Sequence, residues 1–257
     1  MVPRGAKRWV TAAAPARRHA TAPVVLMLVA FAYLPPGGVR ADDSWSATAG
    51  GTTDYVFRGV SQTYGGAAGQ LGLSYQSAQG WFAGAWGSNV DPYPAGASST
   101  ELDLYVGVSE PLCADLALRA TVTRYTYLHD PRPTRYDYSE LAVTLAYLDR
   151  LALTVSYLPD STSYSNIGFA RDKPAAGYEL AAGWPAWWRL EVVGSAGYYD
   201  LHRLFGVGYW AGKAGLAYVD RRLTVELDRF VGDKVLTTLY GDASADGTWA
   251  LSVVLRF

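Results

Sequence analysis

The sequence predicts an all-β protein, a transmembrane up-and-down antiparallel β-barrel of about 12 strands, and three observations support this. From residue 45 onward, apolar and polar residues alternate with the period of two that strands require. Short and long connections alternate between these segments. Charged residues make up 18% of the chain, below the roughly 25% of soluble domains. Because only one face of each strand in such a barrel must be apolar, no long apolar run is needed.

Residues 1–41 are predicted to be a cleaved signal peptide, and residues 42–257 the barrel domain. The segment combines a basic start with an apolar stretch over 24–34, shorter than the roughly 20 residues of a spanning helix. Val39-Arg40-Ala41 then provides a cleavage site. An uncleaved membrane anchor is the alternative. The sequence therefore predicts export to the cell outer membrane.

Removing this segment changes the charge of the protein. The chain has 22 basic and 23 acidic residues, and residues 1–41 hold six of the basic and none of the acidic ones. Residues 42–257 therefore carry a net charge of about −7, which argues against nucleic acid as a partner because phosphate binding needs a basic surface. Cys113 is the single cysteine, so neither an intramolecular disulfide nor a cysteine metal site is expected.

Twelve segments have the alternation of strands, and most are near the 9–11 residues that a tilted spanning strand needs. The last is the clearest, because its large apolar residues all share one face; they are Trp249, Leu251, Val253, Leu255 and Phe257. The first segment and the segment 81–90 are the most weakly patterned. The predicted strands are 45–58, 69–78, 81–90, 100–109, 115–127, 137–148, 151–159, 177–184, 188–199, 208–219, 221–231 and 247–257.

The connections fall into two classes. Tight turns are predicted at Gln79-Gly80, Asp149-Arg150, Pro185-Ala186 and Asp220-Arg221. Long polar connections rich in Gly, Pro, Ser and Asp are predicted at 89–99, 128–136, 160–176, 200–207 and 232–246. A barrel inserted from one side has short periplasmic turns and long external loops. An even number of strands then places both ends of the barrel on the periplasmic side.

Aromatic residues gather near strand ends, which predicts two girdles at the lipid–water boundaries. Near the long loops lie Tyr55, Phe57, Tyr125, Tyr127, Tyr157, Tyr198, Tyr209, Trp210, Phe230 and Trp249. Near the opposite ends lie Trp45, Trp81, Tyr147, Trp184, Trp188, Tyr218 and Phe257. The alternative is that these rings fill the core of a soluble protein.

The polar face of each strand projects into the barrel and gives the candidate pore-lining residues. Seven acids, Glu101, Asp103, Glu140, Glu179, Glu191, Glu226 and Asp228, face four bases, Arg119, Arg189, Lys213 and Arg256. This excess predicts a weak cation preference in a water-filled lumen. Barrels of eight strands are filled by side chains and those of 16 are open, so a lumen of about 12 strands could be either.

Two more candidates lie near the end of the first predicted strand. If Tyr55 and Phe57 face lipid, Asp54 and Arg58 point into the lumen near its outer mouth. One hypothesis is a charged constriction that selects solutes. The other is a structural ion pair, because buried charges normally need partners.

The run Thr53-Asp54-Tyr55-Val56-Phe57-Arg58-Gly59-Val60-Ser61-Gln62-Thr63 resembles the opening signature of the TorF-type porins, a family of predicted proteobacterial outer-membrane proteins. Residues 80–90 and 101–105 are similar to the next blocks of that family, and the resemblance is specific over about 46–108. It implies a barrel and an outer-membrane location but little about substrate. The last strand, from Trp249 to Phe257, resembles the C-terminal signal read by the barrel assembly machinery.

The main functional hypothesis is a channel for passive diffusion of small polar solutes, with lipid and the assembly machinery as further partners. One alternative is a non-conducting structural or surface-binding barrel that uses the 160–176 loop. Another is a barrel-borne lipid-modifying enzyme, which would need a Ser–His pair. The only histidines after residue 41 are His129 and His202, neither in a nucleophile motif, so no enzyme and no cofactor are expected. A soluble secreted β-protein is the last alternative, and the oligomeric state stays open.

Overall fold

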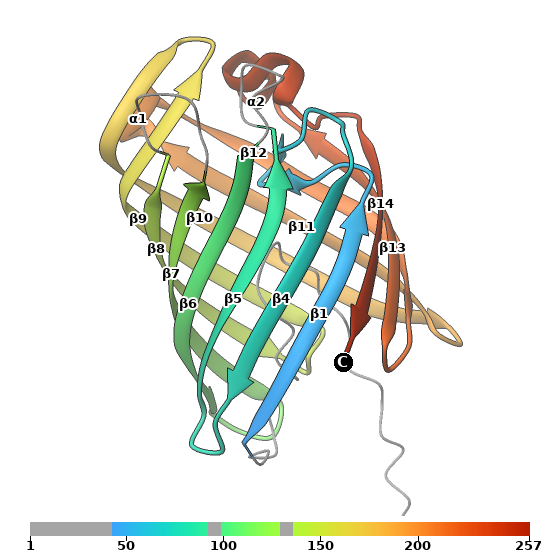
Figure 1. Ribbon diagram of the computed structural model, residues 1–257. Coiled ribbons are helices and arrows are strands. Elements are labelled where there is room, and N and C mark those ends of the chain that lie inside the picture. The colour runs from blue at the N-terminus through green and yellow to red at the C-terminus, as the bar shows by residue number, and fades with distance from the viewer. Residues whose placement is uncertain (1–42, 92–98, 129–135) are drawn as a thin grey trace, which may run out of the picture.

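The computed structural model describes residues 43–91, 99–128 and 136–257; the predicted signal peptide and His129 lie outside these ranges. Twelve strands form one closed antiparallel barrel, in which β1 pairs with β4 on one side and with β14 on the other (Figure 1). The wall consists of β1 (Ser44–Thr52), β4 (Ala68–Gln76), β5 (Trp81–Val90), β6 (Ser99–Pro111), β7 (Leu116–Leu128), β8 (Tyr138–Tyr147), β9 (Leu151–Ser165), β10 (Gly168–Trp187), β11 (Leu190–Leu201), β12 (Val207–Val219), β13 (Leu223–Gly232) and β14 (Trp249–Arg256). The predicted fold class is confirmed.

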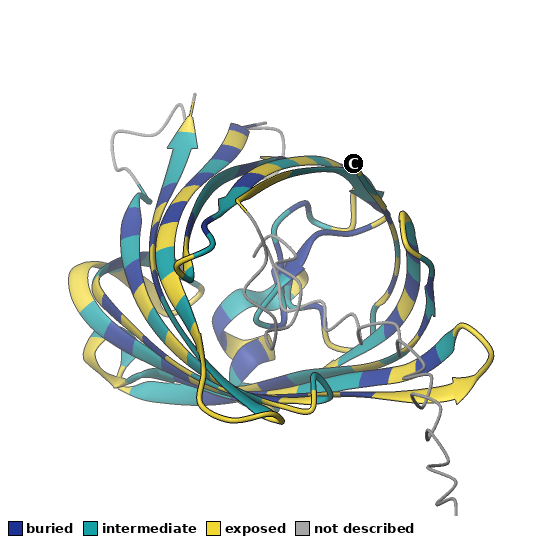
Figure 2. Ribbon diagram, turned by 90° about the horizontal axis from the view of Figure 1, so that it is seen from below, coloured by how far each residue is buried: buried dark blue, intermediate teal, exposed yellow. Residues whose placement is uncertain are grey.

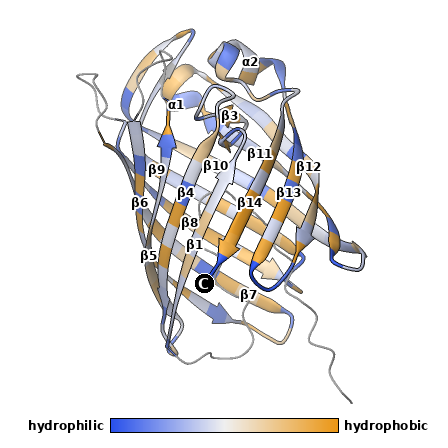
Figure 3. Ribbon diagram, turned by 45° about the vertical axis from the view of Figure 1, so that its right-hand side comes forward, coloured by the Kyte–Doolittle hydropathy of each residue, from blue (hydrophilic) through white to orange (hydrophobic). Residues whose placement is uncertain are grey.

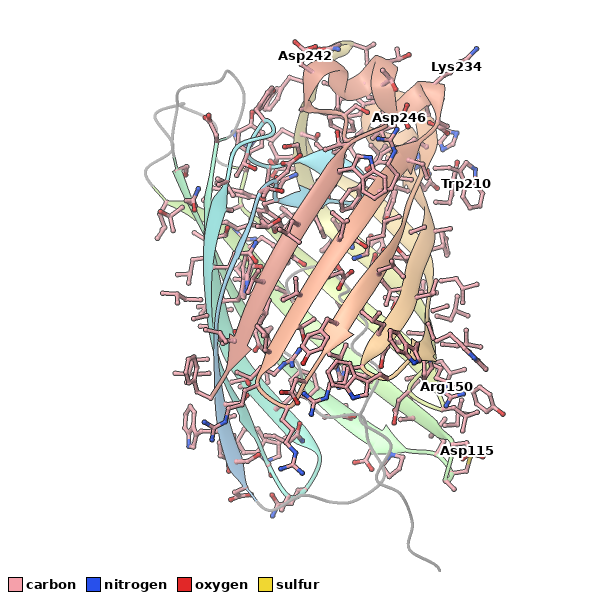
Figure 4. All side chains as sticks on the ribbon, turned by 90° about the vertical axis from the view of Figure 1, so that its right-hand side faces the viewer. Asp115, Arg150, Trp210, Lys234, Asp242 and Asp246 are labelled. Atoms are coloured by element: carbon pink, nitrogen blue, oxygen red, sulfur yellow. The ribbon has the colours of Figure 1, made fainter. Side chains whose placement is uncertain are left out.

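Alternation along each strand separates an inner from an outer face, as β6 illustrates. Its residues Glu101 and Asp103 are each 1% exposed, whereas the next outward residue, Leu104, is 53% exposed. Exposed Leu, Val and aromatic side chains continue around the other strands and give the wall an apolar outer surface (Figure 3). Charged residues such as Asp115 and Asp242 lie at the two ends of the barrel (Figure 4). A closed ring with such a belt can cross a bilayer because it leaves no backbone edge unpaired.

The lower end in Figure 1, where the chain ends, carries the tight turns. Trp45, Trp81 and Trp184 are among the rings exposed on the outer wall there, as predicted. One turn differs from the prediction: β10 continues through Pro185-Ala186 to Trp187, and the chain reverses at Trp188-Arg189. Trp188 has a φ of +54°.

The upper end carries the longer connections, with two corrections. The predicted loop 160–176 is mostly strand, because β9 and β10 extend past the other strands and reverse at Asn166 and Ile167 (Figure 1). The connection 232–246 contains α2 (Lys234–Tyr240) and η1 (Gly241–Ala243), and α1 (His202–Phe205) follows β11. No helix in the described ranges is long and apolar enough to cross a membrane.

The first predicted strand, 45–58, is too long. β1 leaves the wall after Thr52, and a short hairpin of β2 (Val56–Phe57) and β3 (Val60–Ser61) forms a separate sheet. The tip of this hairpin lies inside the barrel, because Arg58 pairs with Glu140 on the inner face of β8. Ribbon of described residues is visible within the ring in a view along the barrel (Figure 2). We call residues 53–67 the inward segment.

The upper aromatic girdle is accordingly only partly as predicted. Trp210, Trp249 and Tyr157 are exposed on the outer wall. Tyr55, Tyr125 and Tyr209 are instead buried, and Phe57 and Tyr127 pack with Tyr55 around buried Trp86. These rings fill the inside of the upper barrel because the inward segment brings apolar side chains there.

Candidate functional site

The inner face of the wall holds ten of the predicted pore-lining residues. They are Glu101, Asp103, Arg119, Glu140, Glu179, Glu191, Lys213, Glu226, Asp228 and Arg256. Five of the acids are no more than 4% exposed, namely Glu101, Asp103, Glu140, Glu226 and Asp228. Buried carboxylates need compensation from cations or hydrogen-bond donors, so their partners define how the lumen is organised.

The inward segment carries one cation into this lumen through a tight hairpin turn. Arg58 and Gly59, between β2 and β3, have φ values of +52° and +79°, the combination found in two-residue turns of the primed type. A Cβ atom on Gly59 would lie 2.5 Å from the Cβ of Ala211 and 3.0 Å from Leu236 Cδ2. Glycine is therefore required both for the turn and for the close approach to β12 and α2.

Arg58 spans from the hairpin to the opposite wall. Its Nη2 donates to Glu140 Oε2 at 2.8 Å and to Ser156 Oγ at 3.2 Å. The guanidinium lies over the rings of Phe57 and Tyr199, at 4.6 and 5.5 Å from their centroids. The Tyr209 hydroxyl donates to the Arg58 carbonyl at 3.0 Å. These contacts fix the hairpin tip across the upper lumen.

Asp54 is not placed as the sequence analysis expected. It lies in the inward segment rather than on a strand face, and its partner is not Arg58. Its Oδ1 accepts from Ser61 Oγ at 2.5 Å and from Thr63 Oγ1 at 3.1 Å. Asp54 therefore closes the base of the inward segment, because its hydroxyl donors lie in β3 and directly after it.

A second cation, Lys213 on β12, joins two acids of the neighbouring strand β13. Its Nζ lies 2.5 Å from Glu226 Oε1 and 2.8 Å from Asp228 Oδ2. A Cβ on Gly215 would lie 2.2 Å from Asp228 Oδ1, so the missing side chain gives this carboxylate its room. We call these three charged residues the Lys213 cluster.

Arg189 does not line the lumen. It lies in the turn between β10 and β11, with 43% of its side chain exposed, and its Nη1 is 2.9 Å from Asp220 Oδ2. A hydrogen bond with the Tyr218 hydroxyl and the charge of Asp220 hold the pKa of Arg189 above its usual value. The placement follows from the turn, which lies three residues beyond the predicted one.

The two remaining inward cations lie against a ring and a hydroxyl group. The Arg119 guanidinium lies 5.4 Å from the Phe82 ring centroid, and Arg256 Nη2 donates to Thr224 Oγ1 at 2.8 Å. Among the described residues, the inner face of the wall carries seven acids and three bases, and the inward segment adds Asp54 and Arg58. The lumen is net acidic.

Some of the inward carboxylate oxygens accept no hydrogen bond from the described residues. Tyr127 donates its hydroxyl to Glu101 Oε1 at 3.2 Å. The other carboxylate oxygen of Glu101 and both oxygens of Asp103 are buried without a hydrogen bond from the described residues. Two neighbouring carboxylates of this kind favour small cations or water in the lumen.

A cavity of about 280 Å³ lies above this acidic region, at the upper mouth. Its walls are the inward segment, the extended β9–β10 hairpin and the ends of β8, β11 and β12. Aromatic rings form one part of its lining and hydroxyl groups another; they include Phe57, Tyr138, Tyr199, Tyr209, Ser161 and Thr162.

His202 is the one histidine among the described residues. His202 lies in α1 with its Nδ1 2.7 Å from Asp200 Oδ1, and its side chain is 57% exposed. In the described ranges, no group of three or more His, Cys, Asp and Glu residues could hold a metal ion. This site is thus built from lumen charges and aromatic rings.

The sequence analysis missed the inward hairpin and the buried tyrosines. The signal for the hairpin was the Arg58-Gly59 pair between Val56 and Val60, because a residue followed by Gly between β-branched residues is typical of a tight turn. For the tyrosines the signal was the alternation itself, because Tyr125 shares a face with Arg119 on the predicted strand 115–127, and Tyr209 shares a face with Lys213 on the predicted strand 208–219.

Several solved structures match the chain at low sequence identity. The KdgM porin is 8% identical with a TM-score of 0.49, covering 82% of this chain and 98% of that one. The NanC porin is 11% identical with a TM-score of 0.47, covering 83% and 98%. LpxR from Salmonella typhimurium is 10% identical with a TM-score of 0.40, covering 82% and 99%. Likeness at this level carries no information about solute or reaction.

The sequence comparisons identify the family. Among curated proteins, none matches the chain. The resemblance to the TorF-type porins is not confirmed under that name. A family model does match residues 40–254, nearly the whole barrel, and the chain belongs to that family, Gcw_chp, described as bacterial protein of unknown function.

Proposed function

We propose that this protein is an outer-membrane channel for passive diffusion of small polar solutes, with a weak cation preference. The observation that carries the proposal is the closed barrel with charged side chains inside and an apolar belt outside. A structural barrel has no need for ten charged residues on its inner face, six of them buried, because each buried charge costs free energy. Water and ions in a lumen reduce that cost.

The inward segment sets the size of what can pass. Arg58 at its tip reaches Glu140 on the far wall and ties the hairpin across the upper lumen. Solutes must pass beside this bridge, so the channel is expected to be narrow and its conductance small. Movement of the hairpin would widen the path.

The cation preference follows from the inward charges. The inner wall carries seven acids and three bases among the described residues, and the inward segment adds one of each, Asp54 and Arg58. Glu101 and Asp103 lie next to each other on the inner face of β6, below the mouth. A ring of acidic side chains in a narrow pore attracts cations and repels anions.

Single-channel recording of the refolded barrel under a salt gradient tests the proposal. Discrete steps with a cation-selective reversal potential are expected. The variant carrying Glu101→Gln and Asp103→Asn should lose at least half of that potential. Asp160→Asn is the matched control, because Asp160 pairs with Arg124 on the outside of the wall and both are partly exposed. Anion selectivity in the unaltered protein would contradict the inward assignment of the acids.

A second function, a non-conducting surface-binding barrel, is favoured by a separate observation. Tyr125, Tyr138, Leu158 and Ala175 form a buried cluster in the upper barrel, which could close the path. A barrel with a heat-modifiable band that stays electrically silent, also after Arg58→Ala, would support this second function and reject the channel.

Export and assembly are parts of the same proposal. Cleavage after Ala41 predicts a mature chain that begins at Asp42, which N-terminal sequencing of the membrane fraction would reveal. The predicted assembly residues Trp249, Leu251, Val253, Leu255 and Phe257 share the exposed outer face of β14 and its end. Deletion of Phe257 should lower the amount of heat-modifiable barrel in cells, with Asp246→Asn as a control.

A further inference from the structure

We propose that the cavity at the upper mouth binds an uncharged, ring-shaped polyhydroxyl solute, a sugar of one or two rings, before it enters the lumen. This inference rests on the proposed channel, for which it names a solute class.

In the aromatic part of the cavity lining, the tyrosines expose their rings to the cavity rather than free hydroxyl groups. Tyr127 donates its hydroxyl to Glu101, Tyr199 to Glu179 at 2.9 Å, and Tyr209 to the Arg58 carbonyl. Because these phenol groups are already bonded, their rings are what they offer to the cavity. Tyr138 stacks on Tyr125 with centroids 4.4 Å apart and planes 15° apart, which holds its ring in place. Such rigid apolar surfaces suit the C–H face of a sugar ring.

A second part of the cavity lining is polar and, among the described residues, uncharged. The β9–β10 hairpin contributes a run of short hydroxyl and amide side chains to the lining: Ser161, Thr162, Ser163, Ser165 and Asn166. Ser161 and Thr162 are 7% and 8% exposed, so the wall fixes their positions. Hydroxyl groups that both donate and accept match the hydroxyl groups of a sugar.

The charge of the cavity argues for an uncharged ligand. Among the described residues that line it, Arg58 and Asp91 are the only charged ones. Arg58 is already neutralised by Glu140 at 2.8 Å, so an anionic ligand would have to compete with a buried carboxylate. A volume of about 280 Å³ lies at the lower end of the roughly 300–1,000 Å³ of small-molecule sites. A sugar of one or two rings has the matching size.

Calorimetric titration of the refolded barrel with glucose, maltose and glucuronate tests the inference, in a detergent without a sugar headgroup. Saturable binding of maltose or glucose is expected, with weaker binding of glucuronate. Thr162→Val and Ser161→Ala should each weaken it about threefold or more through a lost hydrogen bond. Tyr138→Leu should weaken it about tenfold through the lost ring.

Two matched variants separate the site from general effects. Thr154→Val alters a threonine on the same strand that bonds Thr144 at 2.9 Å and does not line the cavity. Tyr157→Leu removes an outward ring of that strand. Both should bind maltose as the unaltered protein does, and a heat-modifiable band confirms that each variant folds.

The outcomes separate the two proposals. No saturable heat with either sugar, tighter binding of glucuronate, or equal losses in the two control variants would overturn the sugar site. Calorimetry does not need a conducting pore, so a barrel that binds maltose but passes no current keeps the site and rejects the channel. A conducting barrel that binds neither sugar rejects only the site.

Discussion

The lumen neutralises its charges in two different ways on two sides of the barrel. In the Lys213 cluster, the cation and both acids lie on adjacent strands, 13 and 15 residues apart in the chain. On the other side, Glu140 is neutralised by Arg58, which is 82 residues away and comes from the inward segment. One cluster is thus fixed by strand register, whereas the other depends on a segment that has left the wall.

This difference separates a cluster on the wall from a bridge to a segment outside the wall. The backbone of Lys213 is held beside its acids because the ladder of β12 and β13 continues on both sides of it. Arg58 is attached to a hairpin of two short strands, held by Asp54 and by a hydrogen bond from Ala245 N–H to the Gly59 carbonyl. We therefore expect the Lys213 cluster to support stability and the Arg58–Glu140 bridge to control passage.

Lys213→Met is expected to have the largest effect, which is a loss of stability. This change leaves Glu226 and Asp228 buried without their shared cation, and breaking a buried ion pair in this way typically costs about 3–5 kcal/mol. The free energy of unfolding in urea, followed by the heat-modifiable band, measures the loss. The triple variant that adds Glu226→Gln and Asp228→Asn should recover most of it. Equal stability of the single variant and the unaltered protein would show that water replaces the cation.

Arg58→Met should change conduction more than stability. Without the guanidinium the hairpin loses its contacts with Glu140 and Ser156, and Glu140 gains access to water once the hairpin moves. Single-channel conductance is expected to rise about twofold or more, and cation selectivity to increase because a positive charge is removed from the narrow part. Arg124→Met is the control, because Arg124 is exposed on the outer wall. An unchanged conductance would mean that the hairpin stays in place without Arg58.

Asp54→Ala should have a smaller effect, through the base of the inward segment. It removes the acceptor of Ser61 and Thr63, a pair of hydrogen bonds to a charged group, and should cost about 1.5–3 kcal/mol. Increased current noise, with closures of variable length, is expected from the loosened segment. Urea unfolding together with current noise analysis measures both. A quiet channel with unchanged stability would contradict the anchoring role of Asp54.

Glu179→Gln should have the smallest effect. Glu179 accepts from the Tyr199 hydroxyl and lies within electrostatic range of both Arg58 and Lys213. The amide keeps the shape and an acceptor, so stability should change by less than about 1 kcal/mol. A double-mutant cycle then measures the coupling free energy between Arg58→Met and Lys213→Met. We expect weak coupling in the unaltered protein and none in the Glu179→Gln variant. Coupling that persists there would mean that the two sides communicate by another route.

The sequence predicted the wall well, because each strand repeats the same physical rule. Inward residues such as Glu101 and outward residues such as Leu104 follow directly from a period of two, and the register then places the Lys213 cluster. The predictions failed at strand ends and at one turn, which the alternation does not determine. The chain leaves the wall at Thr52, β9 and β10 run past their predicted ends, and Arg189 lies in a turn rather than on a strand.

The candidate site was predictable only in part, for the same reason. The acidic excess of the lumen could be counted from alternating residues. That Arg58 reaches Glu140, and that Tyr125 and Tyr209 contact the inward segment, depend on contacts between segments far apart in the chain. The sequence contains the Arg58-Gly59 turn but not the surface against which that turn packs.

The sequence by itself determined the closed barrel, its two faces and the sign of its inner charge, because these follow from local alternation and composition. The tertiary structure alone decided that the inward segment enters the mouth, which cation meets which acid, and that a cavity lined by rings and hydroxyl groups forms above them. The physical reason is that closing the ring brings together side chains whose separation in the chain carries no local signal. Packing against β12 and α2 then selects one path for the segment between β1 and β4.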